Sequence, residues 1–176
     1  NLLRRICLLV LEYTESIDDI LKKDDLSSIE PLLNYHDSVS RISTMAERMI
    51  FKDYHCGDAI FIFDIIQKLR NISLSLCSFL KHSSSSRNEL SDELKLCYKS
   101  LSLHFRNLYD VFYDFSAIKF AELENDNEKF SRDIDKNNFF EENNHLCWTS
   151  LTVLVHRIRD ILEPVLALNY QSGIKG

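Results

Sequence analysis

The chain has 176 residues, a length that suits one compact domain or two small domains that share a core. Only three Gly and two Pro occur, which excludes the many turns of a β-rich fold and predicts an all-α protein. The formal net charge is -6, with basic residues scattered among acidic ones, so a continuous basic face for nucleic acid is not expected.

The first half of the sequence is expected to form three helices. Apolar residues recur every three or four positions along each of them, and these helices span residues 2–23, 27–52 and 57–82. The serine run Ser83–Ser86 follows the third helix and has the composition of a linker. We therefore expect the first structural unit to end there.

The second half is expected to follow the same plan, with helices over residues 89–114, 116–136 and 142–169. A polar break at Asn137 and Asn138 precedes the last of them. Pro164 is expected to bend or shorten that helix, because proline has no N–H to donate. No apolar run in this segment is long enough to span a membrane.

The two halves also match residue by residue. A shift of 89 positions moves the apolar stripe of the third helix onto that of the sixth, and it places Lys68-Leu69-Arg70-Asn71 on Arg157-Ile158-Arg159-Asp160. A shift of 91 positions relates the first two helices to the fourth and fifth, so that Ser40 falls on Ser131. The sequence therefore predicts six antiparallel helices in two tandem three-helix bundles, with repeats over residues 1–83 and 87–170 and a tail over 171–176.

Two segments in equivalent places of the repeat, Gln67–Asn71 and His156–Asp160, bear on function. Together with the tandem three-helix plan, they resemble the PhoU family of phosphate-uptake regulators and the PhoU-like domains of sodium–phosphate cotransporters. The resemblance implies acidic residues four apart at such positions, which share one helical face and bind metal. The first segment has amides instead, whereas His156 and Asp160 keep metal-donor atoms and are the predicted ligands.

Other candidate ligands are incomplete. The fifth helix offers Glu124 and Glu128, an acidic pair four residues apart. The segments His55–Cys56 and His145–Cys147 stand at equivalent turns of the two halves, but neither has a second pair to complete a metal site. For His156 and Asp160, the structural alternative is an ordinary contact across one helical turn. The five cysteines lack C-x-x-C spacing and are expected to be free thiols.

Aromatic residues are unusually frequent along the fourth helix and just after it: Phe105, Tyr109, Phe112, Tyr113 and Phe115. Their number exceeds what a single core-facing stripe of one helix needs. We expect them to be buried between the two bundles; the functional alternative is a surface for a partner or for a second copy of the chain.

These features predict a regulatory or interaction domain and not an enzyme, because no G-x-S-x-G, phosphate-loop or H-E-x-x-H motif occurs. The resemblance implies a phosphate transporter or its sensor kinase as the protein partner, and a homodimer is a further expectation. It also implies a cytoplasmic location, with tethering to the membrane through a region before Asn1. No cofactor is expected beyond the metal ion considered above. The alternative functions are a metal-binding bundle and a helical scaffold unrelated to phosphate.

Overall fold

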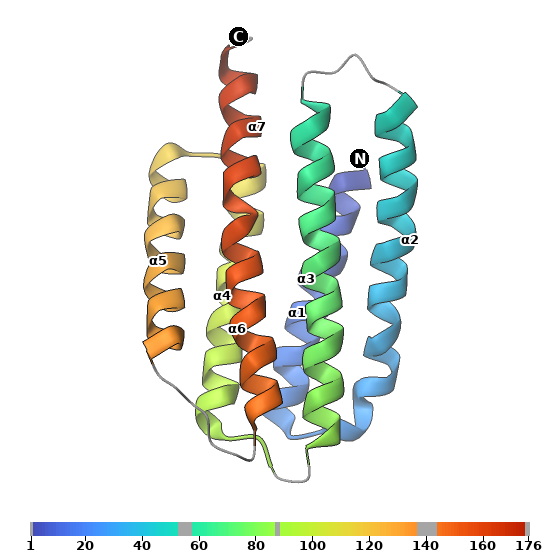
Figure 1. The fold of residues 1–176 in the computed structure, drawn as a ribbon, viewed down its shortest axis with the longest axis vertical. Helices are drawn as coiled ribbons and strands as arrows, with labels where there is room; N and C mark the ends of the chain where they lie inside the picture. The colour runs from blue at the N-terminus through green and yellow to red at the C-terminus, as the bar shows by residue number, and fades with distance from the viewer. Residues whose placement is uncertain (1, 53–57, 87–88, 137–143, 175–176) are drawn as a thin grey trace.

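The computed structural model in Figure 1 describes residues 2–52, 58–86, 89–136 and 144–174, apart from the side chains of residues 27, 28 and 171–174. All six predicted helices are present, and the sixth is divided in two. In chain order the elements are α1 (Leu2–Lys23), the short 3₁₀ helix η1 (Leu26–Ile29), α2 (Glu30–Lys52), α3 (Ala59–Ser85), α4 (Asp92–Tyr113), α5 (Ala117–Lys136), α6 (His145–Asp160) and α7 (Leu162–Ile174).

The helices form two bundles that lie side by side. In the first, α2 packs against α1 and α3; in the second, α5 packs against α4 and α6. The bundles meet where α1 contacts α4 and where α3 contacts α6 and α7. Figure 1 shows α2 and α5 at the outer edges of the molecule. The predicted fold class, two tandem three-helix bundles of antiparallel helices, is therefore confirmed.

Apolar stripes with helical spacing explain why the inner helices pack as they do. On α1, the stripe contains Ile6, Val10 and Ile17, all fully buried, and on α3 and α6 it contains Leu69 and Leu154. These stripes belong to one continuous hydrophobic cluster that runs through both bundles. The two repeats therefore share a single core.

Local capping sets where α4 begins. The sequence predicts a start near residue 89, whereas the helix begins at Asp92. Ser91 is the N-cap, because its hydroxyl oxygen accepts a hydrogen bond from the backbone N–H of Leu94 at 3.3 Å. Asp92 and Glu93 then place two carboxylates in the first turn, where they interact favourably with the helix dipole.

The serine run is not the linker that its composition predicts, because α3 continues through Ser85. Ser83 is fully buried, and its hydroxyl donates to the carbonyl of Phe79 at 2.9 Å. Ser85 bonds in the same way to the carbonyl of Lys81 at 2.8 Å. Serine hydroxyls that bond to the preceding turn are compatible with a helix, so the predicted end of the first repeat at residue 83 falls inside α3.

Pro164 explains the division of the sixth predicted helix. A proline has no N–H to donate to the carbonyl four residues earlier, which here belongs to Asp160. The helix is interrupted at Ile161. The ammonium group of Lys68 on α3 donates a hydrogen bond to the Asp160 carbonyl at 2.9 Å. α7 then continues to Ile174, so the first residues of the predicted tail are helical.

Two reciprocal contacts relate the bundles by an approximate twofold axis. Lys68 donates to the carbonyl of Asp160, and Arg157 donates to the carbonyl of Asn71. The repeat shift of 89 places Lys68 on Arg157 and Asn71 on Asp160, so the two contacts are equivalent. A contact made twice with its partners exchanged is the mark of a twofold interface. Leu69 is fully buried beside these residues.

We expect Leu69→Ala to lower the free energy of unfolding by about 2–5 kcal/mol, because it opens a cavity in the core between the bundles. Leu74 lies on the same helix but is 46 % exposed, compared with 1 % for Leu69. The matched variant Leu74→Ala should therefore change stability by no more than about 0.5 kcal/mol. Urea denaturation followed by circular dichroism measures both, and equal losses would contradict the assigned core.

Candidate functional site

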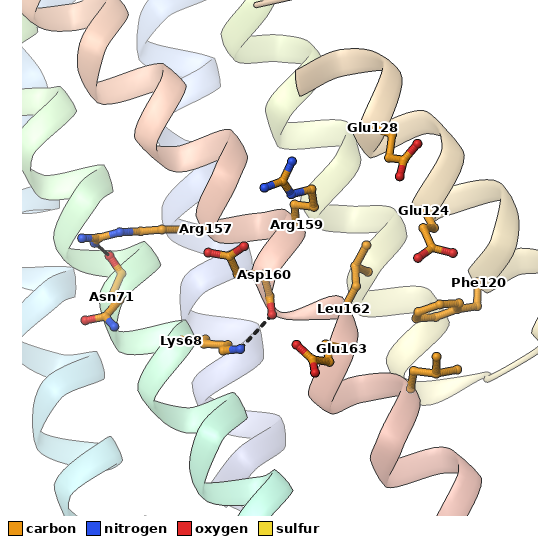
Figure 2. Close-up of a pocket in the computed structure, with 11 residues that line it drawn as sticks. Lys68, Asn71, Phe120, Glu124, Glu128, Arg157, Arg159, Asp160, Leu162 and Glu163 are labelled. Atoms are coloured by element: carbon orange, nitrogen blue, oxygen red, sulfur yellow. Dashed lines mark hydrogen bonds between the residues drawn. The ribbon is translucent and has the colours of Figure 1, made fainter. Parts of the chain in front are cut away.

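A pocket of about 570 Å³ lies beside the break between α6 and α7 (Figure 2). Its walls come from four helices, α3, α5, α6 and α7. The residues that line it are Lys68, Asn71, Phe120, Glu124, Glu128, Arg157, Arg159, Asp160, Leu162, Glu163 and Leu166. The pocket thus combines apolar side chains with charged groups of both signs.

Two of the three cations in this pocket are held by contacts within the chain. Lys68 donates to the Asp160 carbonyl and also forms an ion pair with Asp64, at 3.2 Å. Arg157 donates to the carbonyl of Asn71 across the interface, as Figure 2 shows. Both therefore act mainly as structural links between α3 and α6.

The carboxylates come from two sides of the pocket. Glu124 and Glu128 lie one turn apart on α5, and Figure 2 shows them facing the chain that carries Asp160 and Glu163. The two glutamates were recognisable in the sequence as a pair with helical spacing. Their place in the same pocket as Asp160 follows from the packing of α5 on α6.

The predicted metal ligands point to different neighbours. His156 lies with its Nε2 3.4 Å from a carboxylate oxygen of Asp135 on α5, whereas Asp160 lines the pocket. Within the described part of the chain, no group of three or more His, Cys, Asp or Glu side chains is arranged to hold a metal ion. The assignment of His156 and Asp160 as metal ligands stays a prediction.

Of the two His–Cys segments, only His145–Cys147 lies within the described residues. Cys147 is buried, with its sulfur 3.8 Å from the hydroxyl of Ser83, so it packs at the junction of α3 and α6. His145 is at the first position of α6. The equivalent segment His55–Cys56 lies outside the described residues.

The first bundle carries a polar network that sequence reasoning missed. Arg70 of α3 donates to a carboxylate oxygen of Glu47 at 3.3 Å and to the hydroxyl of Ser40 at 3.0 Å, both on α2. Gln67 donates to the same Glu47 oxygen at 2.8 Å. Gln67 occupies a position where the PhoU resemblance implies an acid, and the network links α2 to α3 through side-chain contacts.

The aromatic run on α4 is mostly internal, as expected. Phe105 is buried, while Tyr109, Phe112 and Phe115 pack against the core from partly buried positions. Tyr113 lies under Arg4, whose guanidinium carbon is 5.4 Å from the ring centroid. This cation–π contact joins α4 to α1 across the interface between the bundles, although Tyr113 itself stays 39 % exposed.

Comparison with known proteins decides the fold. Neither a protein-family model nor a curated protein matches the sequence. A solved structure does match: the phosphate transport system regulatory protein PhoU from Streptococcus pneumoniae, with a TM-score of 0.77 and 16% sequence identity. The alignment covers 96% of this chain and 91% of that one. The chain has the PhoU fold.

Within this fold, the pocket is lined by side chains of both charges. Outside the pocket, Gln67 carries a neutral amide and Arg70 carries a positive charge. Among the described helices, none is both long enough and apolar enough to cross a membrane. The described cysteines, Cys7, Cys77, Cys97 and Cys147, are all free thiols.

The thiol of Cys7 should be almost inert in the native protein. Burial raises its pKa to about 12, so only about one molecule in ten thousand carries the reactive thiolate at pH 8. We expect iodoacetamide at pH 8 to leave Cys7 unmodified in the folded chain and to modify it after denaturation, as read by peptide mass spectrometry. Rapid modification of Cys7 in the folded chain would show that α1 is not packed as described.

Metal analysis tests the predicted ligands directly. Two side chains fill only half of the four positions of a tetrahedral ion, so His156 and Asp160 alone should hold a metal ion only weakly. We expect the chain, purified without chelator, to retain well below one equivalent of transition metal. The variant His156→Ala is the control. One full equivalent of metal that is lost in this variant would overturn the expectation and establish His156 as a ligand.

Proposed function

We propose that this chain is a PhoU-type regulator of phosphate transport that acts through protein–protein contacts and has no catalytic activity of its own. One observation carries the proposal: the PhoU fold extends over 96% of the chain, so both bundles and their mutual arrangement are retained. The solved neighbour is a phosphate transport system regulatory protein. Its role supports the same class of role here.

The pocket has no hydroxyl, thiol or imidazole among the eleven side chains that line it, so a nucleophile paired with a histidine base is absent from it. Its carboxylates and Lys68 are of types that enzymes also use, and they give the pocket charges of both signs. Lys68 and Arg157, which could stabilise a developing negative charge, already bond to backbone carbonyls. A site of this kind suits recognition of charged groups on another protein.

Exposed apolar side chains supply a surface for such a partner where α2 ends and α3 begins. Phe51 is 57 % exposed and Ile60 is 70 % exposed, and Met49, two residues before Phe51 on α2, is also exposed. The ring of Phe51 packs edge-on against Phe63, with centroids 5.5 Å apart, which orders this end of the bundle. Apolar side chains exposed together are typical of protein–protein interfaces.

The proposed partner is a component of a phosphate transporter or its sensor kinase, on the cytoplasmic side of the membrane. If the chain is part of a sodium–phosphate cotransporter, the partner is the membrane region of the same protein. In both cases the regulator acts by binding one state of the partner more tightly than the other, which shifts the equilibrium between them.

A pull-down from membranes tests this proposal. The tagged chain, cross-linked in cells of its source organism and recovered from solubilised membranes, should enrich a phosphate transporter component or a phosphate-sensing kinase. The double variant Phe51→Asp/Ile60→Asp should lower this recovery at least about tenfold, because it buries charge at the proposed contact.

The matched control is Leu96→Asp/Leu103→Asp, which places the same charges on exposed positions of α4. It should recover as much partner as the unaltered chain. Recovery of no phosphate-transport protein by the unaltered chain would reject the proposed function, whereas equal recovery by all three chains would reject only the proposed surface.

A further inference from the structure

The inward face of α5 is polar at its centre. Its buried residues are Phe120, Leu123, Asn127, Ser131 and Ile134. Asn127 is 1 % exposed and Ser131 is 3 % exposed. The two lie four residues apart, so they share one face of the helix and one turn of its length. An apolar face would be expected at this depth, because buried polar groups require hydrogen-bond partners.

Three buried polar atoms of the second bundle lack a hydrogen-bond partner within the described residues. They are Nδ2 of Asn127, the hydroxyl oxygen of Ser131 and Nε2 of His104 on α4. The ring of His104 stacks on Phe130, with centroids 4.9 Å apart and planes at 15°. Because Phe130 precedes Ser131 directly, this stacking places His104 beside the turn that carries the other two.

The hydrogen-bonding role of each atom can be assigned. Nδ1 of His104 lies 2.7 Å from the backbone carbonyl of Ser100, which can only accept, so Nδ1 carries the proton. In the neutral ring, Nε2 is then an acceptor. The Asn127 amide nitrogen is a donor, and the Ser131 hydroxyl can donate or accept. The turn of α5 thus offers one donor and one group that serves as either, and His104 of α4 offers one acceptor.

The first bundle shows how equivalent residues are satisfied by side chains. The repeat shift of 91 places His36 on Asn127 and Ser40 on Ser131. In the first bundle, Nδ1 of His36 lies 3.2 Å from the hydroxyl of Ser73, and Ser40 accepts from Arg70 at 3.0 Å.

Neither of those partners has the same role in the second bundle. The shift of 89 places Ser73 on Leu162, which has no polar atom, and Arg70 on Arg159, which is exposed and lines the pocket. The difference between the repeats therefore explains why Asn127 and Ser131 are left without side-chain partners.

We propose that this turn of α5 binds one internal water molecule between α4 and α5. The water accepts a hydrogen bond from Nδ2 of Asn127, donates one to Nε2 of His104 and shares a third with the hydroxyl of Ser131. Internal waters typically make about three hydrogen bonds to buried polar groups that lack other partners. An amide, a hydroxyl and a ring nitrogen match the donors and acceptors of a water molecule, and no carboxylate, lysine or arginine belongs to the set.

A crystal structure of the unaltered chain at a resolution that shows ordered water tests this proposal. We expect a water within about 2.7–3.2 Å of Asn127 Nδ2 and of His104 Nε2. Direct hydrogen bonds among the three side chains, a site with no density, or density for a larger molecule would each overturn the proposal.

Two variants identify the residue that holds the water. Asn127→Leu removes the donor while keeping a side chain of similar size, and the water peak should be lost. Asn125→Leu makes the same change at an exposed position of the same helix, and the peak should remain. A water that stays at full occupancy in Asn127→Leu would show that Asn127 does not bind it.

Discussion

Burial of α3 against α6 is the constraint on which the rest of the molecule depends. Leu69 and Ile158 occupy equivalent positions in the two repeats and are both almost fully buried. Around them, Lys68 and Arg157 each reach across to a backbone carbonyl of the opposite helix. The apolar contact brings the helices together without fixing their register, whereas the two hydrogen bonds are directional. Together they position two walls of the pocket, those from α3 and α6.

The helical spacing of apolar residues predicted most of the fold, and the errors occur where local hydrogen bonding overrides composition. The stripes of α1 and α3 are regular enough to predict both helices and the repeat. Composition misidentified the serine run, because serine favours loops on average while Ser83 bonds to its own helix. The effect of Pro164 was recognisable from its missing N–H. The hydrogen bond that Lys68 donates to the Asp160 carbonyl was not recognisable, since 92 residues separate the two in the sequence.

The candidate site was predictable only where it depends on one helix at a time. Asp160 and the pair Glu124 and Glu128 follow from spacing, and all three line the pocket. Contacts between helices were missed, such as Glu47 with Arg70 and His156 with Asp135. Sequence spacing limits which faces can meet, but the packing angles that decide which side chains touch depend on the whole core.

The ion pair between Arg106 and Glu15 joins α4 to α1, and the repeat shift of 91 places one of these residues on the other. They therefore stand close to the twofold axis. In a dimer of separate, identical three-helix chains, a residue on the axis would face its own copy, and two arginines or two glutamates would repel each other. Joining the halves in one chain removes that restriction. Opposite charges can then be encoded at a point where a symmetric dimer of identical chains cannot place them.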